Sequence, residues 1–151
     1  MIKKIVLLVI TIILITGCVT TKKYDGEKIV LDNQYYNKGE FLDVKSDYIS
    51  EKSHKNYVLF VYNMFCSLKI PCENIFQEYM TNNEIAFLSM NIDEYKKTKY
   101  YNEVRLAPTV IIVKDNEIVA FLKADSDEDL KKYQDVKEFE QWINSYIYTS
   151  D

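Results

Sequence analysis

The chain has 151 residues, of which 48% are hydrophobic and 14% aromatic, and its formal net charge at pH 7 is −4. This length and composition predict one domain with one sizeable core, and the acidic balance argues against nucleic acid as a partner. Three glycines and two prolines are too few for a linker-rich or low-complexity protein.

The first residues have the pattern of a secretory signal. Lys3 and Lys4 give a basic start, and an apolar run from Ile5 to Ile15 follows. At about eleven residues this run is short for a membrane-spanning helix, which needs roughly 20. The closing residues, Ile-Thr-Gly-Cys18, resemble a bacterial lipobox, whose cysteine receives a diacylglyceryl group and becomes the mature N-terminus. We therefore expect a signal peptide at residues 1–17 and lipidation of Cys18; an uncleaved N-terminal anchor is the alternative.

Residues 18–40 are interpreted as the lipidated N-terminus and a tether. Residues 19–26 are polar, and Ile29-Val30-Leu31 predicts only a short edge strand. Cleavage after residue 17 removes two lysines and no acid, so the net charge falls from −4 to −6. We expect the lipid to provide the membrane contact, on the extracytoplasmic face of the cell membrane.

The folded domain is expected at residues 41–151, and its first half shows strand and helix patterns. Residues 41–44 predict a strand or a helix lead-in, and Ser46 predicts the N-cap of a short helix. The apolar run Tyr57–Tyr62 predicts a strand that is buried on both faces of a sheet. The next helix is expected to begin at Pro71, because proline is best tolerated at the first helical position.

The second half of the domain continues this alternation. Residues 85–92 predict a second buried strand, and residues 93–103 predict a weak helix. Two β-branched or apolar runs, at 109–113 and 117–123, flank Asp115-Asn116 and predict a β-hairpin. Asp135 and Glu138 predict a capping box. The last helix is expected to bury Phe139, Trp142, Ile143, Tyr146 and Ile147. This order predicts an α/β fold with a central mixed sheet flanked by helices.

Cys66 and Cys72 are the remaining cysteines if Cys18 is lipidated. Outside the cytoplasm disulfides are permitted, so we expect these two to pair with each other. A loop of five intervening residues allows the Cα separation of roughly 5.5–6 Å that a disulfide needs. A helix running unbroken from Ser67 would instead separate them by about 9 Å along its axis. The acidic side chain of Glu73 opposes a thiolate at Cys72 and favours Cys66 as the attacking thiol.

Three features together resemble the thioredoxin-like family. They are the buried strand that leads into Phe65-Cys66 and Pro71-Cys72, the tripeptide Ala107-Pro108-Thr109 before the hairpin, and the amphipathic last helix. The resemblance covers residues 41–148. It is closest to exported or lipid-anchored thioredoxin-like proteins, including those called bacteriocin transport accessory proteins.

The resemblance implies a thioredoxin-like fold and specific roles. Cys66 corresponds to the exposed nucleophilic thiol and Cys72 to the resolving thiol. Pro108 corresponds to the family's cis-proline, which with Ala107 and Thr109 contacts an extended substrate. The family spacing has two residues between the cysteines, whereas this chain has five. The buried acid that many thioredoxins use for proton transfer corresponds to Phe60 in this chain.

Two functions from different classes follow from these residues. The first is a membrane-anchored thiol–disulfide oxidoreductase that acts on thiols or disulfides of exported proteins, exchanges electrons with a membrane redox partner and needs no cofactor. The second is a non-catalytic accessory or binding lipoprotein, related to secretion or bacteriocins, whose cysteines form a structural disulfide. His54, the only histidine, is interpreted as a polar loop residue and not as a Cys–His nucleophile site. The cysteines and His54 do not form a four-ligand zinc pattern, so no metal is expected.

Overall fold

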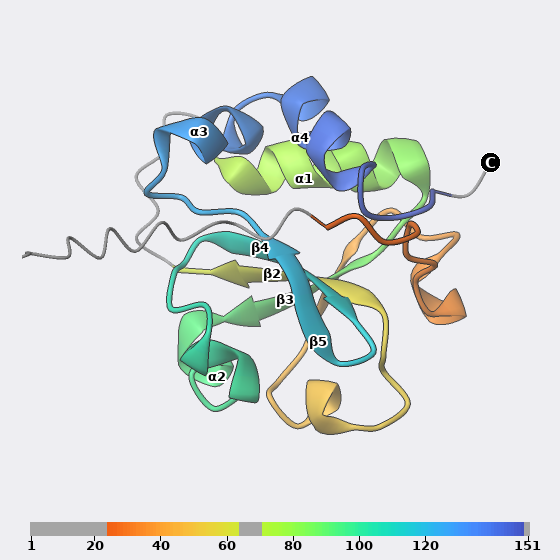
Figure 1. Cartoon of the computed structure of the whole chain (residues 1–151), viewed down its shortest axis with the longest axis vertical. Helices are drawn as coiled ribbons and strands as arrows, with labels where there is room; N and C mark the ends of the chain where they lie inside the picture. The colour runs from red at the N-terminus through yellow and green to blue at the C-terminus, as the bar shows by residue number, and fades with distance from the viewer. Residues whose placement is uncertain (1–23, 64–70, 150–151) are drawn as a thin grey trace, which may run out of the picture.

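The computed structural model describes residues 24–63 and 71–149. Over these residues the chain forms a five-stranded mixed sheet with helices on both faces (Figure 1). The strand order is β1-β3-β2-β4-β5. The strands are β1 (Phe41–Asp43), β2 (Tyr57–Tyr62), β3 (Phe87–Asn91), β4 (Thr109–Lys114) and β5 (Glu117–Phe121). β1, β3 and β2 are parallel, and β4 is antiparallel to both β2 and β5. The predicted α/β fold with a mixed sheet is confirmed.

The helices form two layers around the sheet. On one face, α1 (Cys72–Asn83) packs beside α4 (Val136–Ile143), with α3 (Asp127–Leu130) at the edge of this layer (Figure 1). On the other face lies α2 (Ile92–Tyr95). Four short 3-10 helices complete the described structure: η1 (Asn33–Tyr35), η2 (Tyr48–Ser50), η3 (Lys99–Asn102) and η4 (Lys131–Tyr133).

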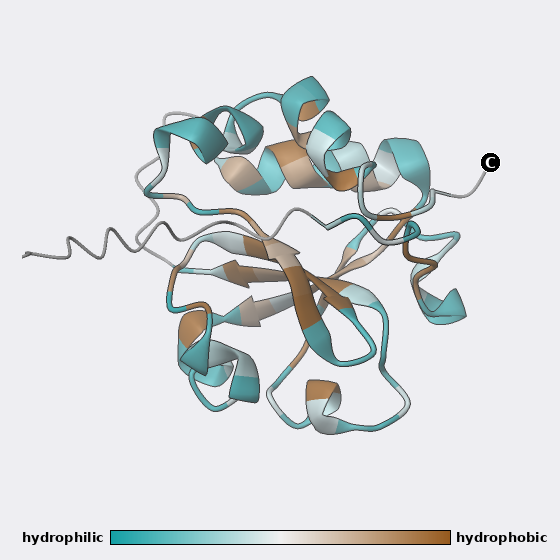
Figure 2. Cartoon of the chain, in the orientation of Figure 1, coloured by the Kyte–Doolittle hydropathy of each residue, from teal (hydrophilic) through white to brown (hydrophobic). Residues whose placement is uncertain are grey.

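The centre of the sheet is β2, which has the bounds that its apolar run predicts. All its residues except Tyr62 are buried, because helices cover both faces and leave no side that needs polar residues. β4 is buried in the same way, so the apolar residues gather in the middle strands (Figure 2). In the predicted hairpin, Asp115 (φ 51°) and Asn116 (φ 64°) both have positive φ, as a type I′ turn requires.

Aromatic side chains join α1 and α4 to the sheet. The Phe139 ring centroid lies 4.6 Å from that of Phe76, 5.3 Å from that of Tyr79 and 6.2 Å from that of Phe87. Burial of such rings supplies most of the packing energy available to a domain of this size. The prediction for α4 holds in part: Phe139, Ile143 and Ile147 are buried, while Trp142 and Tyr146 are only half-buried.

The N-cap of α4 is half of the predicted capping box. Asp135 Oδ1 accepts from the backbone N–H groups of Lys137 and Glu138, at 2.9 and 3.1 Å. The backbone N–H of Asp135 donates to Lys131 O, so it is already satisfied without the Glu138 side chain. The Asp135 side chain therefore caps the N-terminus of α4. Lys131 O, in the preceding η4, accepts the hydrogen bond that the Glu138 side chain would accept in a complete capping box.

The domain begins earlier than predicted. Ile29 forms a parallel bridge with Ile147, and Tyr36 forms an antiparallel bridge with Ile85. Leu31 and Tyr35 are also buried in the core. The predicted boundary between a tether and the domain, at residues 40 and 41, is therefore wrong for this segment. Its partners lie far along the chain, so the short apolar stretch near Ile29 gives no local sign of them.

Two predicted helices also differ in detail. The cap of η2 is Asp47, whose side chain accepts from Tyr48 N; the N–H and hydroxyl of Ser46 donate instead to Glu94. The single helix predicted at 93–103 is divided into α2 and η3. The buried strand predicted at residues 85–92 is shorter in the structure. β3 begins at Phe87, and Ile85 and Ala86 are buried but precede the strand.

The predicted signal peptide at residues 1–17 and the lipidation site Cys18 lie outside the described residues. In the part of the chain that is described, no helix is both long and apolar enough to cross a membrane.

Candidate functional site

Cys72 is the first residue of α1, and Pro71 is its N-cap. The helix therefore starts one residue after the predicted position, within the usual variation of helix boundaries. Pro71 is exposed, whereas Cys72 is buried, with 2% of its surface accessible. This burial fits a thiol that stands behind another reactive group. Cys66 and the loop between the cysteines lie outside the described residues, so their pairing stays a prediction.

Pro108 lies beside the end of β2 that leads toward the cysteines. The Ala107-Pro108 peptide bond is cis, as the resemblance implied. Thr109 follows as the first residue of β4 and pairs with Val61 in β2. This register places the cis-proline next to the C-terminal end of β2. The cis-proline therefore lies at the end of β2 from which the chain continues toward α1 and Cys72.

Tyr133, from η4, bonds to Pro108 and lies near Cys72. Its buried hydroxyl lies 3.1 Å from Pro108 O and 3.0 Å from Leu122 O, and donates toward both carbonyls. Burial raises the pKa of Tyr133 well above its usual value, and the neighbouring Cys72 raises it further. The hydroxyl therefore stays protonated and remains a donor. Sequence reasoning missed this residue.

The predicted substrate contacts differ in their exposure. Thr109 is fully buried, and its hydroxyl donates to Leu122 O at 2.6 Å. Pro108 is buried and Ala107 is half-buried. The Thr109 side chain is therefore a structural link to the end of β5, and Ala107 is the member of the three with accessible surface.

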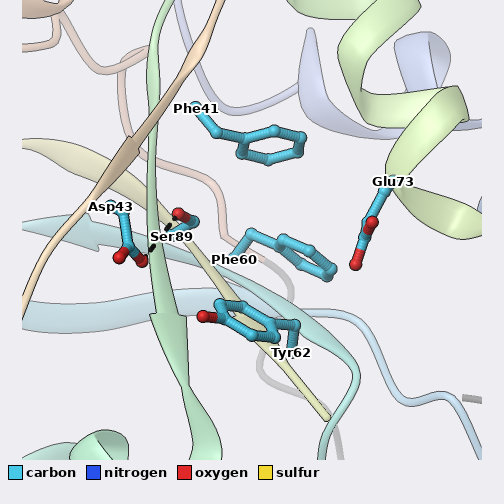
Figure 3. A pocket seen from close by; sticks show the side chains of 6 residues that line it. All are labelled: Phe41, Asp43, Phe60, Tyr62, Glu73 and Ser89. Carbon is cyan, nitrogen blue, oxygen red and sulfur yellow. Dashed lines mark hydrogen bonds between the residues drawn. The ribbon is translucent and has the colours of Figure 1, made fainter. Parts of the chain in front are cut away.

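A cleft of about 320 Å³ opens beside the first turn of α1, near the C-terminal ends of β1, β2 and β3 (Figure 3). Its walls combine three aromatic rings and three polar side chains: Phe41, Phe60, Tyr62, Asp43, Glu73 and Ser89. Glu73 directly follows Cys72, so the cleft and the cysteine share the N-terminal turn of the helix. Ligands often bind beyond the carboxyl ends of parallel strands.

Phe60 occupies the place where the resemblance would have put a proton-transferring acid. Its side chain is buried, 5.4 Å from the Phe41 ring and 5.2 Å from the Phe76 ring between centroids. Its partner across the strands, Ser89, donates to Asp43 Oδ1 at 3.4 Å. No aspartate or glutamate is buried in the part of the chain that the structure describes. Any carboxylate near Cys72 within that part is therefore solvated.

His54 belongs to a separate cluster. It precedes the N-terminal end of β2, whereas the cysteines follow the other end, about 17–20 Å away along a strand of this length. Gln34 Nε2 donates to His54 Nδ1 at 2.7 Å, and the ring stacks on Tyr48 at 4.0 Å. His54 lies in the loop between η2 and β2, as predicted, and its ring is buried. A site with Cys72 is excluded by position.

Within residues 24–63 and 71–149, no group of three His, Cys, Asp or Glu side chains is arranged to hold a metal ion.

No protein-family model matches this chain, and no curated protein matches it. Solved structures do match. A mutant thioredoxin from Halobacterium salinarum NRC-1 is 19% identical, with 75% of this chain and 96% of that chain covered and a TM-score of 0.52. The thioredoxin NaTrxh from Nicotiana alata is 14% identical, with 78% and 98% covered and a TM-score of 0.51. At these identities the likeness shows the fold alone, which is thioredoxin-like.

Proposed function

We propose that the protein is a thiol–disulfide oxidoreductase, anchored to the extracytoplasmic face of the membrane through Cys18, that acts through Cys66 and Cys72. One observation carries this proposal: Cys72 is buried at the first residue of α1, and Tyr133 connects its surroundings to the cis-proline Pro108. This arrangement supports a role for Cys72 as a protected thiol and for the segment at Pro108 as a contact for a substrate chain. The thioredoxin-like fold supports the same chemistry.

The proposed reaction is an exchange of two electrons between two dithiol–disulfide pairs. The Cys66 thiolate attacks one sulfur of a substrate disulfide and forms a mixed disulfide, while the other substrate sulfur leaves as a thiolate that takes up a proton. The Cys72 thiol loses its proton and attacks Cys66 Sγ, which releases the second substrate sulfur as a thiolate. The substrate disulfide is thereby reduced and the Cys66–Cys72 pair is oxidised. The reverse sequence oxidises a substrate dithiol, and a membrane redox partner restores the starting pair.

The described residues prepare Cys72 for the second step. Its position inside the first helical turn keeps substrate away from it, so the mixed disulfide forms first on Cys66. Tyr133 holds Pro108 O and Leu122 O together beneath this edge. The hydroxyl of Thr109 holds Leu122 O from the other side. These buried contacts fix the position of the proline relative to η4 and to the segment that follows β5.

Trapping of the mixed disulfide tests the proposal. In Cys72→Ser the resolving step is blocked, so substrates should accumulate as disulfide adducts on Cys66, detected on non-reducing gels of exported proteins. The matched control Cys66→Ser should form no adducts. Serine is nearly the same size as cysteine, and circular dichroism of both variants checks that the fold is intact. Absence of adducts in Cys72→Ser, together with no disulfide reduction or oxidation by the wild type, contradicts the proposal.

The anchor is tested separately. Cys18→Ala should abolish labelling by a lipid precursor and should change the fractionation of the protein from lipid-bound to released. Retention of lipid label in Cys18→Ala overturns this part of the proposal and leaves the redox chemistry unaffected.

A second function is favoured by Phe60 and by the spacing of the cysteines. A thioredoxin-like accessory or binding lipoprotein would keep the fold, would need no proton-transferring acid, and would use Cys66 and Cys72 as a structural disulfide. The reduction potential of the pair separates the two functions. A value below about −300 mV indicates a structural bond, whereas a higher value indicates a working dithiol.

A further inference from the structure

The cleft beside α1 has a mixed lining that the proposed chemistry does not require. Its aromatic residues Phe41, Phe60 and Tyr62 come from two separate strands, β1 and β2, and face the same space (Figure 3). The ring centroids of Phe41 and Phe60 are 5.4 Å apart, and those of Phe60 and Tyr62 are 6.2 Å apart. Both pairs are tilted by about 35° and do not stack closely. Phe60 is buried, so the ring surface that the cleft offers to a flat group is that of the half-buried Phe41 and Tyr62.

Two carboxylates stand on opposite sides of these rings. Asp43 comes from the end of β1 and Glu73 from the first turn of α1, and both are exposed (Figure 3). Neither forms an ion pair with any other described residue. The lining of the cleft contains no described lysine or arginine. Among the described lining residues, the charge comes from two negative groups beside the negative faces of aromatic rings.

Tyr62 lies within the influence of the same two carboxylates. Its pKa is raised first by burial, and then by the charges of Asp43 and Glu73. Both carboxylates therefore act on the same point at the end of β2. The two carboxylates disfavour a negative charge there and favour a positive one, whereas burial disfavours a charge of either sign.

We propose that this cleft binds the guanidinium group of an arginine side chain, and that this arginine belongs to the polypeptide whose cysteine reacts at the neighbouring thiol site. A guanidinium group is planar, stacks on aromatic faces and donates forked hydrogen bonds to carboxylates. A lysine ammonium group is a compact, strongly hydrated charge that matches only the electrostatic part of this lining. Binding of the guanidinium follows from the cleft itself; its role in selecting substrates rests on the proposed thiol–disulfide exchange.

Titration with small probes tests the binding without any thiol chemistry. Nα-acetyl-arginine amide is added to the ¹⁵N-labelled full chain, and Nα-acetyl-citrulline amide serves as its neutral counterpart of nearly the same shape. The backbone amide signals of residues 43, 62, 73 and 89 should shift with arginine, less with the matching lysine amide, and least with citrulline. The arginine shifts should weaken as the salt concentration rises, because these carboxylates are exposed.

Variants locate the binding site. Glu73→Gln and Asp43→Asn should each weaken arginine binding about two- to fivefold, the range expected for a single exposed ion pair. Phe41→Leu keeps an apolar wall but loses a ring face, and should weaken binding by a similar factor. Glu78→Gln, an exposed acid on the same helix outside the cleft, is the control and should leave binding unchanged. Equal shifts with arginine and citrulline, or unchanged binding in the Glu73→Gln/Asp43→Asn double variant, would overturn the proposal.

The substrate role has its own measurement. Two peptide disulfides that differ only in arginine or citrulline near the cysteine are reacted with Cys72→Ser. The arginine peptide should form the mixed disulfide faster, and the double variant should remove the difference. Adducts that form at equal rates refute the substrate role while the proposed oxidoreductase stands. Arginine binding in the titration with no adduct from either peptide refutes the oxidoreductase, and with it the substrate role, while the cation site stands.

Discussion

Raising the pH above 10 should unfold the protein, because five tyrosines are fully buried. None of the five side chains is accessible to solvent, and burial raises the pKa of each above the usual value of about 10. These residues are Tyr35, Tyr57, Tyr79, Tyr95 and Tyr133. In the unfolded chain these side chains ionise near pH 10, while in the folded chain they stay protonated. The folded state therefore binds more protons above pH 10, and its stability falls as the pH rises.

The size of the effect follows from the number of groups. The stabilising contribution is fully present below pH 10 and is lost as the pH rises from there through the raised pKa values. Each tyrosine that stays protonated only in the folded state lowers the free energy of unfolding by about 1.4 kcal/mol per pH unit. Five such groups give a slope of about 7 kcal/mol per pH unit. A domain with the usual stability of about 5–15 kcal/mol is then unfolded within roughly one to two units above pH 10.

Two signals recorded in one pH titration test this reasoning. Tyrosinate absorbance counts ionised side chains, and fluorescence of Trp142, the only tryptophan, reports on its packing against Phe139. The exposed tyrosines should ionise near pH 10, and the buried ones should ionise together at a higher pH, when the Trp142 signal changes. Gradual ionisation of all thirteen tyrosines with a native Trp142 signal would refute the argument.

Three test substitutions and two control substitutions extend these predictions. Tyr95→Phe should raise the free energy of unfolding by about 1 kcal/mol in urea, because the buried Tyr95 hydroxyl has no hydrogen-bond partner among the described residues. Tyr57→Phe is its matched control and should lower it by about 1 kcal/mol, because its hydroxyl bonds to Tyr100 at 2.9 Å. Phe139→Ala should lower it by about 3–5 kcal/mol by opening a cavity at the centre of the aromatic core; a loss below 1 kcal/mol would contradict this packing. Tyr133→Phe should lower it by about 1 kcal/mol and slow the resolving step, measured as the lifetime of the mixed disulfide, whereas Tyr148→Phe at an exposed site should change neither.

Segments whose structure depends on local pattern could be predicted from the sequence. β2 was found with its bounds because a strand covered on both faces is apolar at every position. The hairpin was found because Asp115-Asn116 suits a turn with positive φ. The segment around Ile29 could not be assigned to the domain, because its bridge to Ile147 joins residues at opposite ends of the described chain.

The site was predictable only where it follows a motif. Cys72 and Pro108 were proposed from the residues that surround them; in the structure Cys72 begins α1 and Pro108 directly precedes β4, beside the C-terminal end of β2. Tyr133 has no such motif, and its contacts to Pro108 and Leu122 cross 25 and 11 residues. The one available signal was an aromatic residue between Lys131-Lys132 and Gln134. A single aromatic side chain in a polar segment is expected to be buried, because burial removes its apolar ring from water. Its hydrogen-bond partners are known only once the fold is known.

Phe60 stands where the family resemblance implies a proton-transferring acid, and it also lines the cleft beside α1. An acid at this position would lie between the rings of Phe41 and Phe76, where burial strongly disfavours its charged form. Phe60 fills the space with apolar surface and gives the cleft its middle ring. The acids of this region, Asp43 and Glu73, then stand at the rim, where water solvates them. In the proposed reaction the proton from Cys72 therefore passes toward solvent, and the two exposed carboxylates remain available for the proposed guanidinium site.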